Sequence, residues 1–447
     1  MRSITQWRLA LLPALFFCGS ALAATFTVTN TNDSGAGSLR QAFLDASNSD
    51  VIDFNAGLSG SVITLNSAIS IDNLTVTING LGRDNLAIQT SGAFRLFEID
   101  SNADVIFRDI ALQNSGSPTL AGAVIVEGNS ILELHSVRVA NNVGEGGGAI
   151  RIAGGSNLTV MDSIFESNSA GSVGGAIAVD GNGTEELNVV RSEFRGNTAT
   201  PPAPAGRGGA ISIFHGTYLI YDSLFSGNEA TRSGSALTLN TAATGEIYNS
   251  TFAGNFSGTG GAINVNGTLT MGNTIVALNA ANDPNRDIDM GGSGVLNSAG
   301  GNLVGDNTGA DAVFPAGEPN GSGDFAGTAA SLLDPLFVSA ASAALGSPST
   351  GGDFQLTAAS PAINVGLNAN APTGTDLAGN ARIQFGTVDI GAYESPFDTP
   401  LPPAAPAAPG SGVSAESIPT LPLAGLGLLG AALALLARRR LRANRSA

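Results

Sequence analysis

The chain has 447 residues, of which 36 are aspartate or glutamate and 19 are basic, and its formal net charge at pH 7 is −17. Every basic residue is an arginine, and seven of these lie within residues 1–23 or 438–447, which leaves 12 arginines and a net charge of about −24 in between. This excess of negative charge repels nucleic acid and anionic polysaccharide, so we expect neither as a partner.

Residues 1–23 have the layout of a secretory signal peptide, and we expect them to direct export across the inner membrane. Two arginines precede an apolar run of ten residues, which includes the only cysteine of the chain. Once the signal is removed, the mature chain holds no thiol or disulfide, so its stability has to come from packing. The small residues predicted to frame the cleavage site are Ala21, Ala23 and Ala24.

Residues 24–60 are predicted to form a cap over the N-terminal end of a stacked β-structure. An alternating stretch predicts a strand first, and Ser38 is then a suitable helix N-cap with Gln41 three residues later. A stacked β-structure needs such a cover because an exposed edge strand invites association with other chains. The apolar face of the predicted helix consists of Leu39, Ala42, Phe43 and Ala46.

Between residues 121 and 279 two short motifs alternate with a sustained period. A GGAI-like step is followed 15 to 21 residues later by an FxxN-like step, and the pair occurs five times after one imperfect copy. The aliphatic residue that ends the first motif recurs every 26 or 27 residues, apart from one step of 34 that contains a proline-rich insert at residues 200–204. These aliphatic residues are Ile150, Ile177, Ile211, Leu237 and Ile263.

Each repeat holds two or three short runs with alternating or β-branched apolar positions, separated by Gly, Asn, Asp and Ser. Because no window has a clean 3.6-residue period with capping residues, a helical repeat is disfavoured. We predict three short parallel strands per turn, with successive turns about 4.8 Å apart. Phenylalanines should stack inside the coil, and asparagines in left-handed turns should bond to each other. They are Phe165, Phe194, Phe225 and Phe252, with Asn168, Asn197, Asn228 and Asn255.

The paired motifs resemble the repeat of the polymorphic outer membrane protein family, whose passenger regions are right-handed β-helices. The resemblance covers about residues 121–279. It implies that residues 61–329 form a single-stranded right-handed parallel β-helix, a pectate-lyase-like solenoid, within an all-β fold. The fold would contain the cap helix and one C-terminal transmembrane helix besides the solenoid.

A second set of short sequence motifs follows the repeats, at residues 334–337, 353–356, 360–366, 375–380 with Arg382, and 388–394. This combination resembles the choice-of-anchor Q domain, which is found on surface proteins just ahead of interchangeable anchoring tails. The resemblance covers residues 330–395. It implies a separate module, which we expect to close the far end of the solenoid.

The remaining sequence predicts a linker, a membrane helix and a basic tail. Residues 396–417 are rich in Pro, Ala, Gly and Ser, whereas residues 418–437 are uncharged and long enough to cross a bilayer. The arginines of residues 438–447 favour a cytoplasmic end. This order resembles the IPTL-CTERM sorting signal, which implies processing by an exosortase-type enzyme; a plain single-pass anchor is the alternative. The sorting residues would be Ile418, Pro419, Thr420, Leu421, Arg438, Arg439 and Arg440.

The sequence offers few candidates for catalysis or metal binding. Lyases and hydrolases built on β-helices need a basic residue or clustered carboxylates. Asp162 and Asp222 occupy equivalent repeat positions, but Arg191 and Asn249 stand there in other coils, so we expect turn residues and no acidic column. The two histidines lie in strand-like runs, and no nucleotide or zinc motif occurs, so neither a catalytic residue nor a cofactor is predicted. Weak calcium-ligand candidates are Asp283, Asp287 and Asp289.

Together these features predict an exported, non-enzymatic β-helix of the cell envelope or cell surface, which serves as a stalk or an adhesive and is retained or released through its C-terminal signal. A surface glycan or protein would be its ligand. The first alternative is an extracellular carbohydrate-active enzyme, either a polysaccharide lyase or a hydrolase. Three acidic side chains within about 6 Å in a lateral groove would favour that alternative. The second alternative is a structural protein that stays tethered to the inner membrane.

Overall fold

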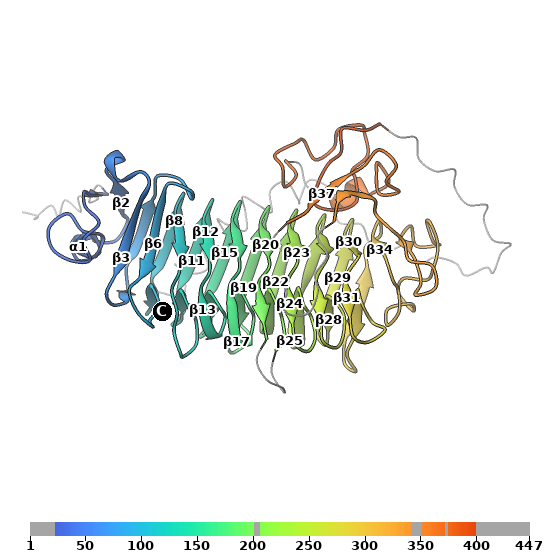
Figure 1. The fold of residues 1–447 in the computed structure, drawn as a ribbon, viewed down its shortest axis with the longest axis horizontal. Helices are drawn as coiled ribbons and strands as arrows, with labels where there is room; N and C mark the ends of the chain where they lie inside the picture. The colour runs from blue at the N-terminus through green and yellow to red at the C-terminus, as the bar shows by residue number, and fades with distance from the viewer. Residues whose placement is uncertain (1–22, 201–205, 341–350, 372–373, 399–447) are drawn as a thin grey trace, which may run out of the picture.

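A computed structural model describes residues 23–200, 206–340, 351–371 and 374–398, which form an all-β, right-handed parallel solenoid of about ten turns. The coils stack along one axis from the N-terminal cap, in blue, to the yellow coils that precede residue 330 (Figure 1). The predicted solenoid is therefore confirmed. The predicted membrane helix at residues 418–437 lies outside the described residues, as do residues 1–22 of the predicted signal. Among the described residues, no helix is both long and apolar enough to cross a membrane.

Each coil passes through up to four columns of parallel strands. Two columns join in an 18-stranded sheet, called sheet A, while the other two form an 11-stranded sheet B and a 6-stranded sheet C. Pairing is in register with the sequence repeat, so that Ile150 lies opposite Ile177, and Ile177 lies opposite Ile211. One sequence repeat is therefore one coil, and residues that are equivalent in the motif become neighbours along the axis.

The strands of sheet A belong to two columns that are joined by two long strands, β22 (Ile211–Tyr221) and β25 (Leu237–Tyr248). The column that follows the GGAI motif also contains β4 (Ile69–Asp72), β7 (Phe97–Asp100), β10 (Val124–Val126), β14 (Ile150–Ile152), β18 (Ile177–Val179), β28 (Ile263–Val265) and β32 (Ile288–Met290). The other column also contains β1 (Thr25–Val28), β2 (Asp50–Phe54), β5 (Thr75–Asn79), β8 (Asp104–Arg108), β11 (Ile131–His135), β15 (Asn157–Met161), β19 (Glu186–Val190), β29 (Thr268–Gly272) and β33 (Val295–Ser298).

Sheets B and C form the other sides of the coil. Sheet B contains β3 (Ser61–Leu65), β6 (Leu86–Thr90), β9 (Ala111–Gln113), β12 (Arg138–Ala140), β16 (Ile164–Glu166), β20 (Glu193–Arg195), β23 (Leu224–Ser226), β26 (Thr251–Ala253), β30 (Ile275–Ala277), β34 (Leu303–Val304) and β35 (Phe325–Ala326). Sheet C contains β13 (Val143–Gly146), β17 (Ser169–Val173), β21 (Thr198–Ala199), β24 (Glu229–Ala230), β27 (Phe256–Ser257) and β31 (Ala280–Ala281).

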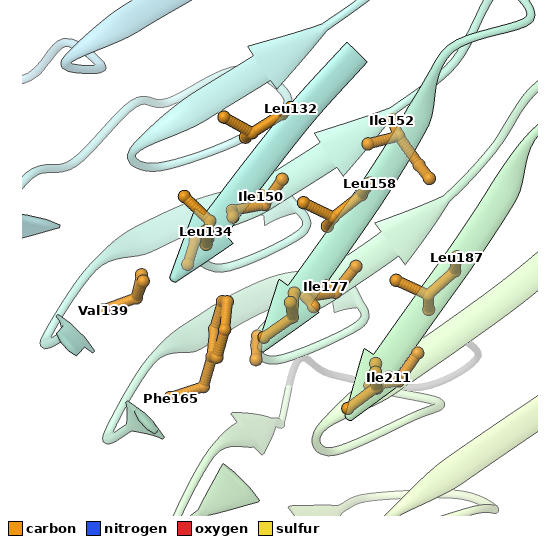
Figure 2. Close-up of a cluster of buried hydrophobic side chains, with 14 of the residues drawn as sticks. Leu132, Leu134, Val139, Ile150, Ile152, Leu158, Phe165, Ile177, Leu187 and Ile211 are labelled. Carbon is orange, nitrogen blue, oxygen red and sulfur yellow. The ribbon is translucent and has the colours of Figure 1, made fainter. Parts of the chain in front are cut away.

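The interior of the solenoid consists of files of like side chains, one from each coil. The ring centroids of Phe165, Phe194 and Phe225 are 4.8 Å apart, with planes within 10° of parallel, and Phe252 follows at 4.5 Å. All four rings are buried, which confirms the predicted stack. Figure 2 shows the aliphatic counterparts, which point into the coil as files of Leu132, Leu158 and Leu187 and of Ile150, Ile177 and Ile211.

The asparagines of the FxxN motif form a buried hydrogen-bond ladder between sheets B and C. Nδ2 of Asn168 donates to Oδ1 of Asn197 at 2.9 Å and to the carbonyl oxygen of Val139 at 2.9 Å. The same two bonds recur in each coil from Asn142 onward, so every buried amide is satisfied. The ladder ends at Asn279, whose Nδ2 donates to Oδ1 of Asp287 at 2.9 Å. The predicted bonding between asparagines of successive coils is confirmed.

The left-handed turn residue is the one before each asparagine, and not the asparagine itself as predicted. In four successive coils this preceding residue has a φ angle between 55° and 68°. A left-handed residue there turns the chain at the corner, which leaves the following asparagine free to aim its amide inward at its counterparts. These four residues are Ser167, Gly196, Gly227 and Gly254.

The two glycines of the GGAI motif have different reasons to be glycine. The first has positive φ, as at Gly174, where φ is 63°. The second lies against the next coil, because a Cβ atom built at Gly175 would lie 1.9 Å from the carbonyl oxygen of Gly209. The first glycine therefore serves the turn, and the second allows adjacent coils to approach.

The N-terminal end is covered by α1 (Leu39–Asp45), and η1 (Ala56–Leu58) follows β2. The Ser38 hydroxyl accepts a hydrogen bond from the backbone N of Gln41 at 3.2 Å, which confirms the predicted N-cap. Of the predicted apolar face, Leu39, Ala42 and Phe43 are buried, and the Phe43 ring lies 5.9 Å from that of Phe97.

The described residues between 330 and 395, called the C-terminal module below, pack on the side of the solenoid. This position differs from the predicted closure of the far end. The antiparallel pair β36 (Phe337–Ser339) and β37 (Asp353–Leu356) lies above sheet B, in orange in Figure 1, and η2 (Asn368–Asn370) follows. The module is drawn to this side by apolar residues on the outer face of sheet B, whereas Ala310 and Phe314 complete the core at the far end.

Candidate functional site

Turn residues at the corner between sheets A and B form the column in which the predicted acidic candidates lie. Asp162, Arg191, Asp222 and Asn249 occupy this corner in four successive coils, with φ angles of 53°, 43°, 49° and 47°. Arg191 binds the Asp162 carboxylate through two bonds, from Nε to Oδ1 at 2.7 Å and from Nη2 to Oδ2 at 3.0 Å. These residues are turn residues, as predicted, and the two aspartates are separated by an arginine.

A buried ion cluster joins Asp222 to the C-terminal module. The Arg382 side chain is only 1% exposed, and its Nε lies 3.3 Å from Oδ1 of Asp222. Its Nη1 lies 3.3 Å from Oε1 of Glu394, while Nη2 donates to the carbonyl oxygens of Gly391 and Asn249. Arg382 thus contacts acceptors of the solenoid and of the module at once, which makes it the central residue of their interface.

The other acidic residues of the module bind its own backbone. Oδ2 of Asp376 accepts a hydrogen bond from the backbone N of Glu394 at 2.7 Å. The Asp389 carboxylate accepts bonds from the backbone N atoms of Asn364 at 2.7 Å and Ser395 at 2.6 Å. The motifs at residues 360–366, 375–380 and 388–394 therefore meet in one polar core, where their carboxylates hold irregular backbone in place through hydrogen bonds.

The carboxyl groups of this cluster are weaker acids than usual, because burial raises their pKa values. Burial raises the pKa of Glu394 to about 8, and Arg382 offsets only part of that effect. Burial also raises the pKa of Asp222 to about 6 and raises the pKa of Asp389. The side chains of Asp222, Arg382 and Glu394 are at most 5% exposed. They are not accessible to a large substrate, so the cluster is suited to docking the module and not to turnover.

Of the candidate calcium ligands, Asp283 and Asp289 both accept hydrogen bonds from Asn285, whereas Asp287 is bonded elsewhere. Asp287 is buried at the end of the asparagine ladder, and burial raises its pKa to about 7. Asp283 accepts a bond from the backbone N of Gly260 at 2.6 Å, and Asp289 accepts one from Nδ2 of Asn264 at 2.6 Å. Within the described ranges, no three His, Cys, Asp or Glu side chains are grouped so that they could hold a metal ion.

The two histidines lie on separate strands of sheet A. Nε2 of His135, on β11, lies 3.0 Å from Oε2 of Glu133 on the same strand, and both side chains are partly exposed. His215, on β22, has a buried Nδ1 that finds no hydrogen-bond partner in the part of the chain that the structure describes.

A cleft of about 300 Å³ lies where the C-terminal module meets sheet B. β20 contributes Glu193 and Arg195 to its lining, β23 contributes Ser226, and the module contributes Asp353 and Tyr393. Sequence reasoning missed this cleft because its two walls come from separate parts of the chain and no local motif contains both. Only the docking of the module onto the side of the solenoid brings them together.

Comparison with known proteins supports the repeat. The family model for the repeat of the Chlamydia polymorphic membrane protein matches residues 162–180. This segment begins at the turn before β16, continues through β17 and the second GGAI motif, and ends just after β18. The match is thus to one stretch from an FxxN step to the next GGAI step. No curated protein sequence matches the chain.

Proposed function

We propose that the chain is an exported, non-enzymatic protein of the cell envelope that serves as a surface stalk or an adhesive rod. The observation that carries this proposal is that the repeat residues point into the coil or lie between coils. The phenylalanines, asparagines and second glycines of the motifs are all used inside the coil or between coils. The repeat therefore specifies a stiff rod with long lateral faces, a shape that is suited to binding a glycan or protein along its length.

The repeat match supports a location at the surface. Proteins of the Chlamydia polymorphic membrane protein family are exposed on the outer membrane, and the same kind of β-helix in this chain fits an envelope or surface location. The formal net charge of −17 fits this location, because a strongly charged rod stays soluble and resists self-association.

We also propose how the rod is exported and held. Residues 1–23 direct export, residues 24–60 cap the rod, residues 61–329 form it, and residues 330–395 act as a choice-of-anchor Q module. The linker at residues 396–417 then leads to an IPTL-CTERM-like signal, made of the helix at 418–437 and the basic tail at 438–447. Recognition of Ile418 to Leu421 by an exosortase-type enzyme would remove the tail.

Protease treatment of intact cells tests the surface location. In cells that express the full chain, external protease should degrade the solenoid while a cytoplasmic marker protein stays intact. A variant that lacks residues 418–447 provides the matched control, because it should appear in the medium instead. Protection of the full chain until the cells are lysed would contradict the surface location.

Intact-mass measurement tests the sorting signal separately. The mature protein should begin near Ala24 and should lack residues 438–447 after processing. A mass that still includes residues 438–447 would contradict processing by an exosortase-type enzyme. It would favour the plain single-pass anchor.

A further inference from the structure

The cleft between sheet B and the C-terminal module has unsatisfied polar atoms at its solenoid wall. The Ser226 side chain is fully buried, and its Oγ has no hydrogen-bond partner among the residues that the structure describes. Nε of Arg195, on the neighbouring strand, is also buried without a hydrogen-bond partner in this part of the chain, although it lies 3.5 Å from Oε2 of Glu193. Buried polar atoms are nearly always paired, so a hydroxyl without a partner beside a guanidinium nitrogen that has an ion-pair contact but no hydrogen bond points to a ligand that supplies the missing bonds.

The charges around the cleft argue against an anionic ligand. Arg195 is already paired with Glu193 and with Glu166, whose Oε2 lies 3.3 Å from Nη2. Asp353 adds a further carboxylate on the module side. The acidic groups therefore outnumber the one guanidinium that lines the cleft, and a second negative charge placed there would be repelled.

The remaining lining suits a ligand with hydroxyl groups and an apolar face. Ser226 Oγ both donates and accepts, Arg195 Nε donates, and the carboxylates of Glu193 and Asp353 accept. Tyr393 supplies an aromatic ring at the wall formed by the module, where burial keeps the phenol neutral by raising its pKa. A sugar hydroxyl donates and accepts at the same oxygen, and the C–H groups of a sugar ring pack on an aromatic side chain.

We propose that this cleft binds one neutral sugar residue of an extracellular glycan. Its volume, about 300 Å³, lies at the small end of the range for ligand sites, so it takes a single ring and not an extended chain. The inference rests on the proposed function, because it names the ligand class of an adhesive rod. The cleft can bind its ligand only while the module is docked, because Ser226 belongs to the solenoid and Tyr393 belongs to the module.

Saturation-transfer NMR on the full mature chain tests the proposal with named probes. Glucose, galactose, mannose and N-acetylglucosamine serve as neutral sugars, and glucuronic and galacturonic acids serve as their anionic counterparts. At least one neutral sugar should bind, and should bind at least fivefold more tightly than either acid. Binding of none of the four, or tighter binding of an acid, would overturn the proposal.

Two variants locate the binding in the cleft. Ser226→Ala removes only an unpaired hydroxyl, so the thermal unfolding midpoint should not fall, whereas affinity for the bound sugar should fall at least fivefold. Arg195→Lys keeps the charge but removes Nε, and should weaken binding similarly. The matched control is Ser212→Ala, because Ser212 Oγ is also buried without a partner but lies on sheet A. Full affinity in Ser226→Ala, or an equal loss in Ser212→Ala, would overturn the assignment.

Adhesion of the chain to glycan-coated beads separates this proposal from the proposed function. If the wild-type protein adheres and Ser226→Ala adheres equally well, then the rod is adhesive and the cleft is not its site. If the wild-type protein binds a neutral sugar in solution but the cells that display it do not adhere, then the cleft assignment stands and the adhesive role fails.

Discussion

The outer face of sheet B has an exposed stretch and a covered stretch, and the two differ although the coils beneath them are alike. In the exposed stretch, β12, β16 and β20 carry Arg138, Glu166, Glu193 and Arg195, which form ion pairs and are partly exposed. In the covered stretch, β23, β26 and β30 present buried apolar residues to the C-terminal module. These residues are Leu224, Ala253, Ile275 and Ala277.

The interior is the same under both stretches. The phenylalanine stack from Phe165 to Phe252 and the asparagine ladder from Asn142 to Asn279 both cross the boundary between the two stretches. The interior pattern is thus set by the coil itself, whereas the outward residues are set by whatever lies on top of them. A change inside the coil should therefore have the same effect in both stretches, and a change on the outer face should not.

The largest effect is expected from breaking the asparagine ladder, and it should be similar under the two stretches. Asn168→Ala and Asn255→Ala each remove the acceptor of two buried N–H donors of the preceding coil and the donor to one buried carbonyl oxygen, at about 1–3 kcal/mol each. Each should lower the free energy of unfolding by at least about 3 kcal/mol, as measured by denaturant titration with far-UV circular dichroism. A large loss for one variant with none for the other would show that the two interiors differ.

Removal of the buried arginine should cost more than removal of an exposed one. Arg382→Met leaves Asp222 and Glu394 buried without their cation, which costs about 3–5 kcal/mol and should undock the module. Arg138→Met, in the exposed stretch, removes a partly exposed pair with Glu166 and should cost about 0–1 kcal/mol. Near-UV circular dichroism reports undocking, because Tyr221 and Tyr393 lie at the interface. Equal effects of the two substitutions would contradict the comparison.

A reciprocal exchange between the two stretches should have a somewhat smaller effect. Glu193 and Leu224 are register partners on β20 and β23. Leu224→Glu places a carboxylate under the module and should weaken docking by about 2–3 kcal/mol. Glu193→Leu copies the covered residue into the exposed stretch and should change stability by no more than about 0.5 kcal/mol. Hydrogen exchange of the module measures docking in both variants, and tight docking in Leu224→Glu would show that this stretch is not covered.

The last expected effect is a pH dependence of docking in the covered stretch. Glu394 has a pKa of about 8 in the folded protein against an ordinary value of 4.5, so it holds its proton more tightly when docked. Its contribution is complete below pH 4.5 and is lost as pH rises through about 8, with Asp222 adding the same trend up to about pH 6. Hydrogen exchange of the module should therefore be slower at pH 5 than at pH 9, after correction for intrinsic rates. Glu394→Gln should flatten this dependence; a dependence of opposite sign would contradict it.

The inside of the solenoid was predictable from the sequence because repetition makes it visible. The phenylalanine stack and the asparagine bonds between coils follow from one motif that recurs at a fixed period. The cap helix was predictable from its N-cap residue Ser38, which is also a local sequence signal. The detail that failed was the left-handed residue, which is one position before the asparagine. In three of these four coils that position is a glycine, the residue that takes positive φ most easily, so the sequence did carry a signal that the prediction overlooked.

The outer face was not predictable, because it depends on contacts between distant segments. From the sequence, Asp222 was expected to be a turn residue, and Arg382 was part of a motif in the C-terminal module. The two form an ion pair only because the module docks on the solenoid. The small outward residues Ala253 and Ala277 gave a faint signal, since a solvated strand would normally carry polar residues there. The cleft beside them is lined by residues of the solenoid and of the C-terminal module, which are far apart in the sequence, so no sequence motif indicated it.

Chemical cross-linking tests most directly the central claim that the module lies on the side of the solenoid. Tyr221 Oη donates to the carbonyl oxygen of Asn370 at 3.2 Å, and the chain has no cysteine beyond residue 18 to interfere. A cysteine pair from Tyr221→Cys and Asn370→Cys should be joined by a short bismaleimide in the full mature chain. The pair from His135→Cys and Asn370→Cys should not be, because His135 lies in the same strand file three coils away, about 14 Å along the axis. Failure of the first pair to cross-link, or equal yields for both pairs, would contradict this position of the module.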